Sequence, residues 1–218
     1  VSFPDGSFVQ GSTVFAAHGY TVRTRYKDAD IIYVSPSHMN RQGDVMPIQR
    51  RLELCAHSAD TGAVVIEDDF ENDFLYSSTP TPSLYALGCG NVVYMGAFSA
   101  LLLPGIRISF MVLSPALAAT YHQMKDTFAQ TASKTEQIAL CAYLRDGNMK
   151  SRTKKIRRLY TGKAKTLCAL LAKALPDHPV RVGENGLQVQ IETPMLPDSA
   201  PFEQAGLALY IVKEKSGK

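Results

Sequence analysis

The sequence lacks the short motifs that identify several large enzyme classes. It has no Walker A loop and no GxGxxG fingerprint, the two glycine-rich patterns that bind nucleotide phosphates. Ser99 is not flanked by the glycines of a hydrolase nucleophile elbow. Nothing in the sequence therefore supports nucleotide binding of these two types or serine-hydrolase chemistry.

Cysteine is scarce and scattered. The four residues, Cys55, Cys89, Cys141 and Cys168, stand far apart and form no CxxC pair. Such spacing is typical neither of a zinc site nor of a disulfide framework. We therefore expect four free thiols in a reducing cytosol.

Signals for export or membrane insertion are also missing. No basic and then apolar leader opens the chain at Val1. The apolar stretch 91–106 is too short and too rich in Gly, Ser and Pro to span a bilayer. A net charge of +3 over 218 residues does not by itself imply a nucleic-acid or membrane partner. We expect a cytoplasmic protein without a membrane partner.

The first half of the chain alternates apolar runs with an amphipathic segment. A helix is expected from about residue 47 to 59, with Gly62 just beyond its end, and another from 115 to 128. Four apolar runs predict strands: residues 30–35, 63–68, 91–96 and 107–113. This alternation predicts an α/β fold with a mostly parallel sheet and flanking helices. Ligands bind such sheets at the carboxyl ends of the strands.

The second half is mainly helical and locally basic. Nine basic residues fall between Arg145 and Lys165, against the single acid Asp146. Such a stretch is either a nucleic-acid patch or a solvated connecting helix with Ile156 facing inward, and the second reading is favoured. Residues 180–194 predict a hairpin, and 200–215 a short helix running toward a strand.

Polar loops follow the expected strands and are the candidate sites. An acidic cluster at a strand end can hold a metal, bind an organic cation or face water, and no second acidic loop completes a metal site. Arg107, just after a Pro-Gly turn, is placed to bind a phosphate or to form a structural ion pair. His38 and Asn40 lie in the loop after the first strand, where a lone histidine is more often structural. The acids of the cluster are Glu67, Asp68, Asp69, Glu71 and Asp73.

Three of these loops, taken in order, resemble the fold-type I pyridoxal-phosphate (PLP) domain of aspartate aminotransferases, most closely that of MocR-type regulators in the GntR family. The motifs are SPSHMNRQGDVMPIQRR (35–51), VIEDDFENDF (65–74) and GAFSALLLPGIRISF (96–110), with a helix pair at 136–160. The resemblance implies a PLP-binding large domain over 1–135, incomplete at its N-terminus. It also implies connecting helices over 136–178 and part of a small α+β domain over 179–218.

The resemblance assigns roles to the polar residues. Asp68 takes the place of the aspartate that pairs with the pyridinium nitrogen, and Arg107 that of the phosphate-binding arginine. Asn40 stands where an asparagine holds the phenolic oxygen of the cofactor. His38 and Ser99 complete the cofactor-binding set that the resemblance implies.

The sequence departs from the family at three of these positions. Phe70 replaces a tyrosine, and Ala97 replaces a phosphate-binding Ser or Thr. Ala100 occupies the catalytic position of the lysine that forms the Schiff base with PLP, and alanine has no amine. The resemblance thus implies PLP that is absent or held without a covalent bond, and no transamination.

The functional expectation follows from these assignments. We expect the PLP-binding effector and dimerisation domain of a MocR-type transcriptional regulator, acting as a homodimer that senses PLP or an amino acid. DNA is expected to bind only through an N-terminal winged helix that this chain does not contain. The alternative is a 2-aminoadipate or aromatic aminotransferase inactivated at Ala100. No metal is expected in either case.

Overall fold

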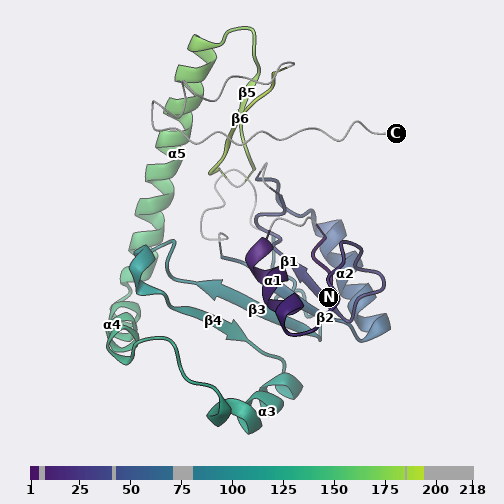
Figure 1. The fold of residues 1–218 in the computed structure, drawn as a ribbon. Helices are drawn as coiled ribbons and strands as arrows, with labels where there is room; N and C mark the ends of the chain where they lie inside the picture. The colour runs from purple at the N-terminus through teal and green to yellow at the C-terminus, as the bar shows by residue number, and fades with distance from the viewer. Residues whose placement is uncertain (5–7, 41–42, 71–80, 185, 194–218) are drawn as a thin grey trace.

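A four-stranded mixed sheet organises the first half of the molecule (Figure 1). The computed structural model describes residues 1–4, 8–40, 43–70, 81–184 and 186–193. The sheet has the order β1-β2-β3-β4, with the first three strands parallel and the fourth antiparallel to β3. The strands are β1 (Ile31–Val34), β2 (Val64–Asp68), β3 (Val92–Ala97) and β4 (Ser109–Val112). The predicted α/β fold with a mostly parallel sheet is confirmed.

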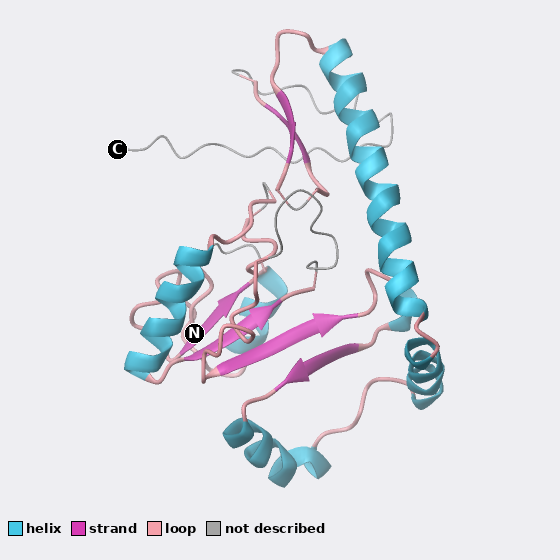
Figure 2. Cartoon of the chain, turned by 180° about the vertical axis from the view of Figure 1, so that it is seen from behind, coloured by secondary structure: helices cyan, strands magenta, loops and turns pink. Residues whose placement is uncertain are grey.

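Two helices cover opposite faces of this sheet, as the front and back views show (Figures 1 and 2). Helix α2 (Ile48–Thr61) buries Leu54 in the main core, beside Ile32 and Val65. Burying a leucine side chain of this size stabilises the fold by about 1.5–3 kcal/mol. The helix ends at Gly62, whose φ of 75° lies in the left-handed region that glycine adopts without strain.

Helix α1 (Val9–Ala17) covers the other face and was not expected from the sequence. Its segment has no periodic apolar face, and none of its residues is buried. The contact is made instead by aromatic rings, with Phe3 stacked on Tyr33 at 4.8 Å and edge-on to Phe15 at 5.9 Å between centroids. Aromatic packing across distant segments is not visible in a local hydrophobic pattern.

The second half is built from helices that follow one another beside the sheet. Helix α3 (Pro115–Met124) is shorter than predicted and passes into η3 (Lys125–Thr127). Gly147, with φ at 72°, separates α4 (Lys134–Arg145) from α5 (Asn148–Ala174). Another short 3-10 helix, η2 (Pro104–Ile106), precedes β4. No helix in the described part of the chain is long and apolar enough to cross a membrane.

A small antiparallel hairpin lies beside the C-terminal half of α5 (Figures 1 and 2). It pairs β5 (Val180–Val182) with β6 (Val189–Ile191), which confirms the hairpin expected within 180–194. The helix and strand expected over 200–215 lie outside the described residues. The division into domains at residues 135 and 178 stays a prediction.

Two cysteines correct the expectation of four free thiols. Cys55 on α2 and Cys89 before β3 form a disulfide, with their Cα atoms 5.2 Å apart. The two cysteines are separated by 34 residues in sequence, so no local motif predicts the disulfide. The parallel crossover brings the two segments together. Cys141 and Cys168 are free thiols.

Candidate functional site

The polar residues singled out in the sequence lie along one edge of the sheet. Asp68 ends β2 and Ala97 ends β3, and parallel strands end at the same edge. Ala97 pairs with Ser109 of the antiparallel β4, so Arg107 lies two residues from the strand at that same edge. The amide of Phe98 donates to the carbonyl of Ile108 at 3.0 Å and closes the connection. The topology therefore brings a carboxylate and a guanidinium to one edge.

Strand alternation separates Asp68 from the acids on either side of it. Asp68 shares a face with Ile66, which pairs in register with Tyr33 of β1. The Tyr33 hydroxyl donates a hydrogen bond to the carboxylate of Asp68, which is half-buried. This face is the one that α1 covers. A half-buried carboxylate with one donor in place is suited to pair with a protonated ring nitrogen.

Glu67 points to the α2 face and is fully buried. Its two carboxylate oxygens accept the backbone N–H groups of Leu84, at 2.8 Å, and Tyr85, at 3.0 Å. Burial raises the pKa of Glu67, and the two N–H bonds oppose that rise. The carboxylate therefore fixes the segment before β3 to the sheet, a role that the sequence interpretation missed.

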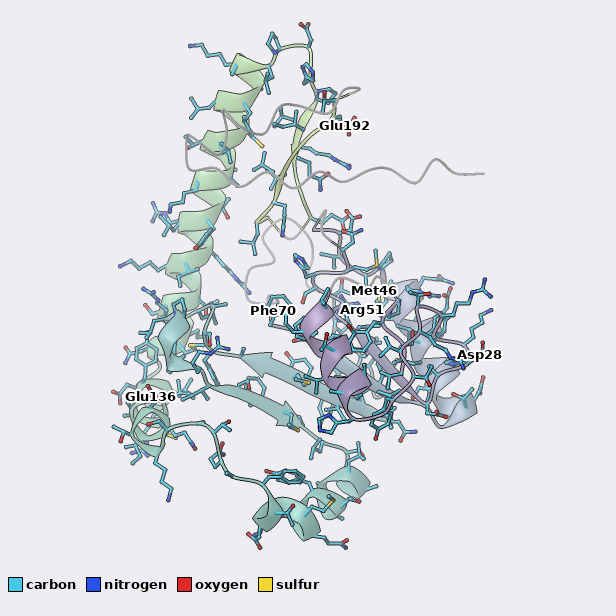
Figure 3. The ribbon with its side chains drawn as sticks, in the orientation of Figure 1. Asp28, Met46, Arg51, Phe70, Glu136 and Glu192 are labelled. Carbon is cyan, nitrogen blue, oxygen red and sulfur yellow. A yellow bond between two sulfur atoms is a disulfide. The ribbon has the colours of Figure 1, made fainter. Side chains whose placement is uncertain are left out.

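Arg51 on α2 is the buried cation of this region, at 2% exposure. Its Nε donates to the carbonyl of Met46 at 3.0 Å, and Figure 3 shows the two residues side by side. Its two terminal nitrogens donate to the carbonyls of Pro82, at 3.0 Å, and Pro36, at 3.3 Å. Burial lowers the pKa of the guanidinium, against the attraction of the charges of Glu67 and Asp69. Arg51 thus ties α2 to two loops.

The Asp69 side chain is also hydrogen-bonded within the protein. Its carboxylate accepts from the Ser37 hydroxyl and from the Tyr94 hydroxyl, the latter at 2.9 Å. The described acids of the cluster therefore diverge, with Asp68 on one face and the other two on the opposite face. Glu71 and Asp73 lie outside the described residues. In the described ranges no group of three or more His, Cys, Asp or Glu side chains is placed to hold a metal.

The loop after β1 brings His38 near the end of β2. Its ring lies 5.9 Å from the ring of Phe70, centroid to centroid. Asn40 bonds to Asp44, donating to a carboxylate oxygen at 2.8 Å and accepting the Asp44 backbone N–H at 3.1 Å. Both polar ends of the Asn40 amide group are therefore bonded to Asp44. Contact of Asn40 with a cofactor oxygen stays a prediction.

The turn between β3 and β4 carries the remaining residues. The amide of Leu102 donates to the carbonyl of Phe98 at 3.0 Å, so Ser99 and Ala100 lie within a tight turn, Ala100 being exposed. Leu101 is 1% exposed and packs against Ile156 of α5. The turn is thus anchored by the residue next to Ala100.

Arg107 has an unusual backbone. Its φ of 46° is the sole positive value for a residue other than glycine in the described part of the chain. A non-glycine residue in this region costs about 1 kcal/mol or more. Strain of this kind is concentrated at sites that bind or react, and Arg107 is exposed at the sheet edge.

These side chains suit a planar, phosphorylated, nitrogen-containing ring. The edge offers a carboxylate for a protonated ring nitrogen, a guanidinium and a hydroxyl for a phosphate, and aromatic side chains for the ring faces. The chemistry of the donor set thus fits PLP. The residues concerned are Asp68, Arg107, Ser99, His38 and Phe70.

The chain is similar to known proteins over most of its length. The family model described as aminotransferase class I and II matches residues 23–210. The uncharacterized HTH-type transcriptional regulator YdeL of Bacillus subtilis is 33% identical over 78% of this chain and 37% of its own length. The probable rhizopine catabolism regulatory protein MocR of Rhizobium meliloti is 30% identical over 74% of this chain and 33% of its own.

A solved structure shows the same fold. LysN, the α-aminoadipate aminotransferase of Thermus thermophilus complexed with N-(5'-phosphopyridoxyl)-L-leucine, matches with a TM-score of 0.65 and 24% identity. The match covers 88% of this chain and 49% of that one. The chain thus spans a third to a half of the length of these proteins. The resemblance drawn from the sequence is confirmed, and the chain belongs to the aminotransferase class I and II family.

Proposed function

We propose that this chain is the PLP-binding effector domain of a MocR-type transcriptional regulator and that it holds its ligand without a covalent bond. The observation that carries the proposal is that Asp68 and Arg107 lie at the same edge of the sheet, next to a turn that has Ala100 in place of an amine. The regulators among its relatives support the choice of a regulator over an enzyme.

Each residue has a stated task in this proposal. Arg107 and Ser99 bind the phosphate, and Asp68 pairs with the ring nitrogen and keeps it protonated. His38 and Phe70 contact the ring faces. When bound, PLP supplies an aldehyde and an electron-withdrawing ring.

Ala100 determines whether the site can catalyse a reaction of bound PLP. It has no amine to attach to the aldehyde and no base to move a proton from the α-carbon of an amino acid. Loss of such a proton-transfer group lowers a rate by about 10²–10⁴-fold. The site is therefore suited to bind PLP, or PLP already joined to an amino acid, and not to turn it over.

The proposal also covers the whole protein, of which this chain would be one part. We infer a cytoplasmic homodimer in which sequence-specific DNA binding belongs to an N-terminal winged helix outside these 218 residues. Binding of PLP or of an amino-acid adduct would then set the position of this domain relative to the winged helix.

Ligand binding without turnover tests the proposal. Equilibrium dialysis with PLP and with N-(5'-phosphopyridoxyl)-L-leucine should show saturable binding of both. Arg107→Ala and Asp68→Asn should each weaken binding at least tenfold, about the effect of losing one charged hydrogen bond. Arg25→Ala, an exposed arginine remote from the edge in sequence, is the matched control. Equal affinity in all four proteins would overturn the proposal.

The alternative is an aminotransferase of 2-aminoadipate or aromatic type that Ala100 inactivates. The match to the aminotransferase family model supports this alternative. It predicts that Ala100→Lys restores amino transfer to 2-oxoglutarate in a chain of full family length. Absence of transfer in that chain, with PLP bound, would exclude it.

A further inference from the structure

Positive charge is segregated on helix α5. Its 27 residues contain nine lysines and arginines and no acid. The rest of the chain has 14 basic and 20 acidic residues. The modest net charge of the protein therefore hides one strongly basic element on an otherwise acidic molecule.

The basic residues of α5 include a one-sided row, here called the α5 row: Lys150, Lys154, Arg158 and Lys165. With 3.6 residues per turn these four project within about 80° of one another. All four are exposed. The buried Ile156 faces the opposite side of the helix, toward Leu101. Figure 3 shows nitrogen-tipped side chains projecting from the side of α5 turned away from the hairpin.

This arrangement does not serve the stability of the helix. Lys150 lies in the first turn, where the helix dipole disfavours a cation, and that turn contains no acid and no side-chain cap. Lys154 follows Lys150 by four residues and precedes Arg158 by four, and each such like-charge pair costs about 0.2–0.5 kcal/mol. A bound polyanion would remove both costs.

We infer that the α5 row is a sequence-independent contact for the phosphate backbone of double-stranded DNA. The row extends over about 22 Å, and the duplex presents one charge per about 1.7 Å of its axis. Such a contact goes beyond the proposed function, in which sequence-specific DNA binding belongs to a winged helix outside the chain. It also does not depend on PLP or on Ala100.

The composition of the row favours DNA over an acidic protein. Protein interfaces are centred on buried apolar or aromatic side chains, whereas phosphates require only cations and hydrogen-bond donors. The exposed leucines of α5, Leu159, Leu167 and Leu170, project about 100° or more away from the nearest residue of the row. The nucleic-acid reading that the sequence left open is thus strengthened by the exposure and one-sidedness of the charges.

Fluorescence anisotropy with a labelled duplex of about 30 base pairs and arbitrary sequence tests the inference. The 218-residue chain should bind, and the logarithm of its affinity should fall linearly with the logarithm of salt concentration. Four phosphate contacts predict a slope of about −3 to −4. The triple variant K150E/K154E/R158E should bind at least tenfold more weakly, with a slope shallower by about 2–3.

The control keeps the same change of net charge but places it elsewhere. In R25E/K27E/K125E three exposed basic residues outside α5 are reversed, and affinity should stay within about twofold of the parent. Circular dichroism should give the same helix content for all three proteins. Equal loss in both triple variants, or no binding at low salt, would overturn the inference. So would a polyglutamate peptide that binds the row more tightly than the duplex.

Discussion

The Nε of Arg152 donates to the carbonyl oxygen of Leu101 at 3.1 Å. A second nitrogen of the same guanidinium donates to the carbonyl of Leu102 at 3.4 Å. One side chain of α5 thus holds the turn that carries Ala100, and the buried pair of Leu101 and Ile156 lies beside it. The geometry of the candidate site therefore depends on a helix from the second half of the chain.

Arg152→Met tests this dependence, because methionine keeps an unbranched apolar side chain but removes both donors. We expect the free energy of unfolding to fall by about 1–3 kcal/mol, the effect of leaving such acceptors unpaired. Hydrogen exchange at the amide of Leu102 should quicken. Lys155→Met, an exposed residue of the same helix, should change neither quantity. Unchanged exchange at Leu102 in R152M would contradict the anchoring role.

Burial of Glu67 predicts a particular dependence of stability on pH. Its folded-state pKa is raised above the usual value of about 4.3, so ionisation of the buried carboxyl opposes folding. Relative to Glu67→Gln, the parent should lose stability as the pH rises from about 4 through the raised pKa, and then level off. Below the unfolded-state pKa the difference should be constant.

Urea unfolding of both proteins between about pH 4 and pH 7 measures that difference. Gln49→Ala, at an exposed position of α2, is the control, and its difference from the parent should not depend on pH because neither side chain titrates. If the parent instead gains stability over E67Q with rising pH, the two backbone donors outweigh burial and the assignment of cause is wrong.

The disulfide between Cys55 and Cys89 should contribute substantially to stability. It closes a loop of 34 residues, for which the chain-entropy estimate is about 3–4 kcal/mol. Reduction, or C55S/C89S, should therefore lower the free energy of unfolding by an amount of that order. C141S/C168S, which changes the two free thiols, should respond to reductant as the parent does. A parent whose unfolding is insensitive to reductant would contradict the prediction.

Much of the fold was predictable because its strands are short apolar runs with parallel pairing. Strand β1 is largely buried on both faces and leaves a nearly continuous apolar run, and β2 buries one face in the main core. Helix α1 has no such sequence pattern, since it packs through the aromatic ring of Phe15 against Phe3, a residue outside the helix. The disulfide was missed because the crossover between β2 and β3, and not local spacing, brings its cysteines together.

The motifs predicted the residues of the candidate site, whose contact with a cofactor stays a prediction, but they did not predict which acids bond within the protein. The motifs located Asp68 and Arg107, and the sheet brings them to one edge. Strand alternation was the available signal that Glu67 and Asp69 face away from Asp68, toward the α2 face. Glu67 bonds to the segment before β3, and Asp69 bonds to Ser37 and Tyr94. These partners come from elements distant in sequence, so only the fold reveals the bonds.

The central claim is that Ala100 leaves a PLP site that binds without a covalent bond. The most direct measurement compares the parent and Ala100→Lys after saturation with PLP, treatment with borohydride and denaturation. The account predicts that the parent binds PLP but releases all of it on denaturation, whereas the lysine variant shows a shifted absorbance band and retains PLP on Lys at position 100. Retention of PLP at equal yield in the two proteins, or binding in neither, would contradict it.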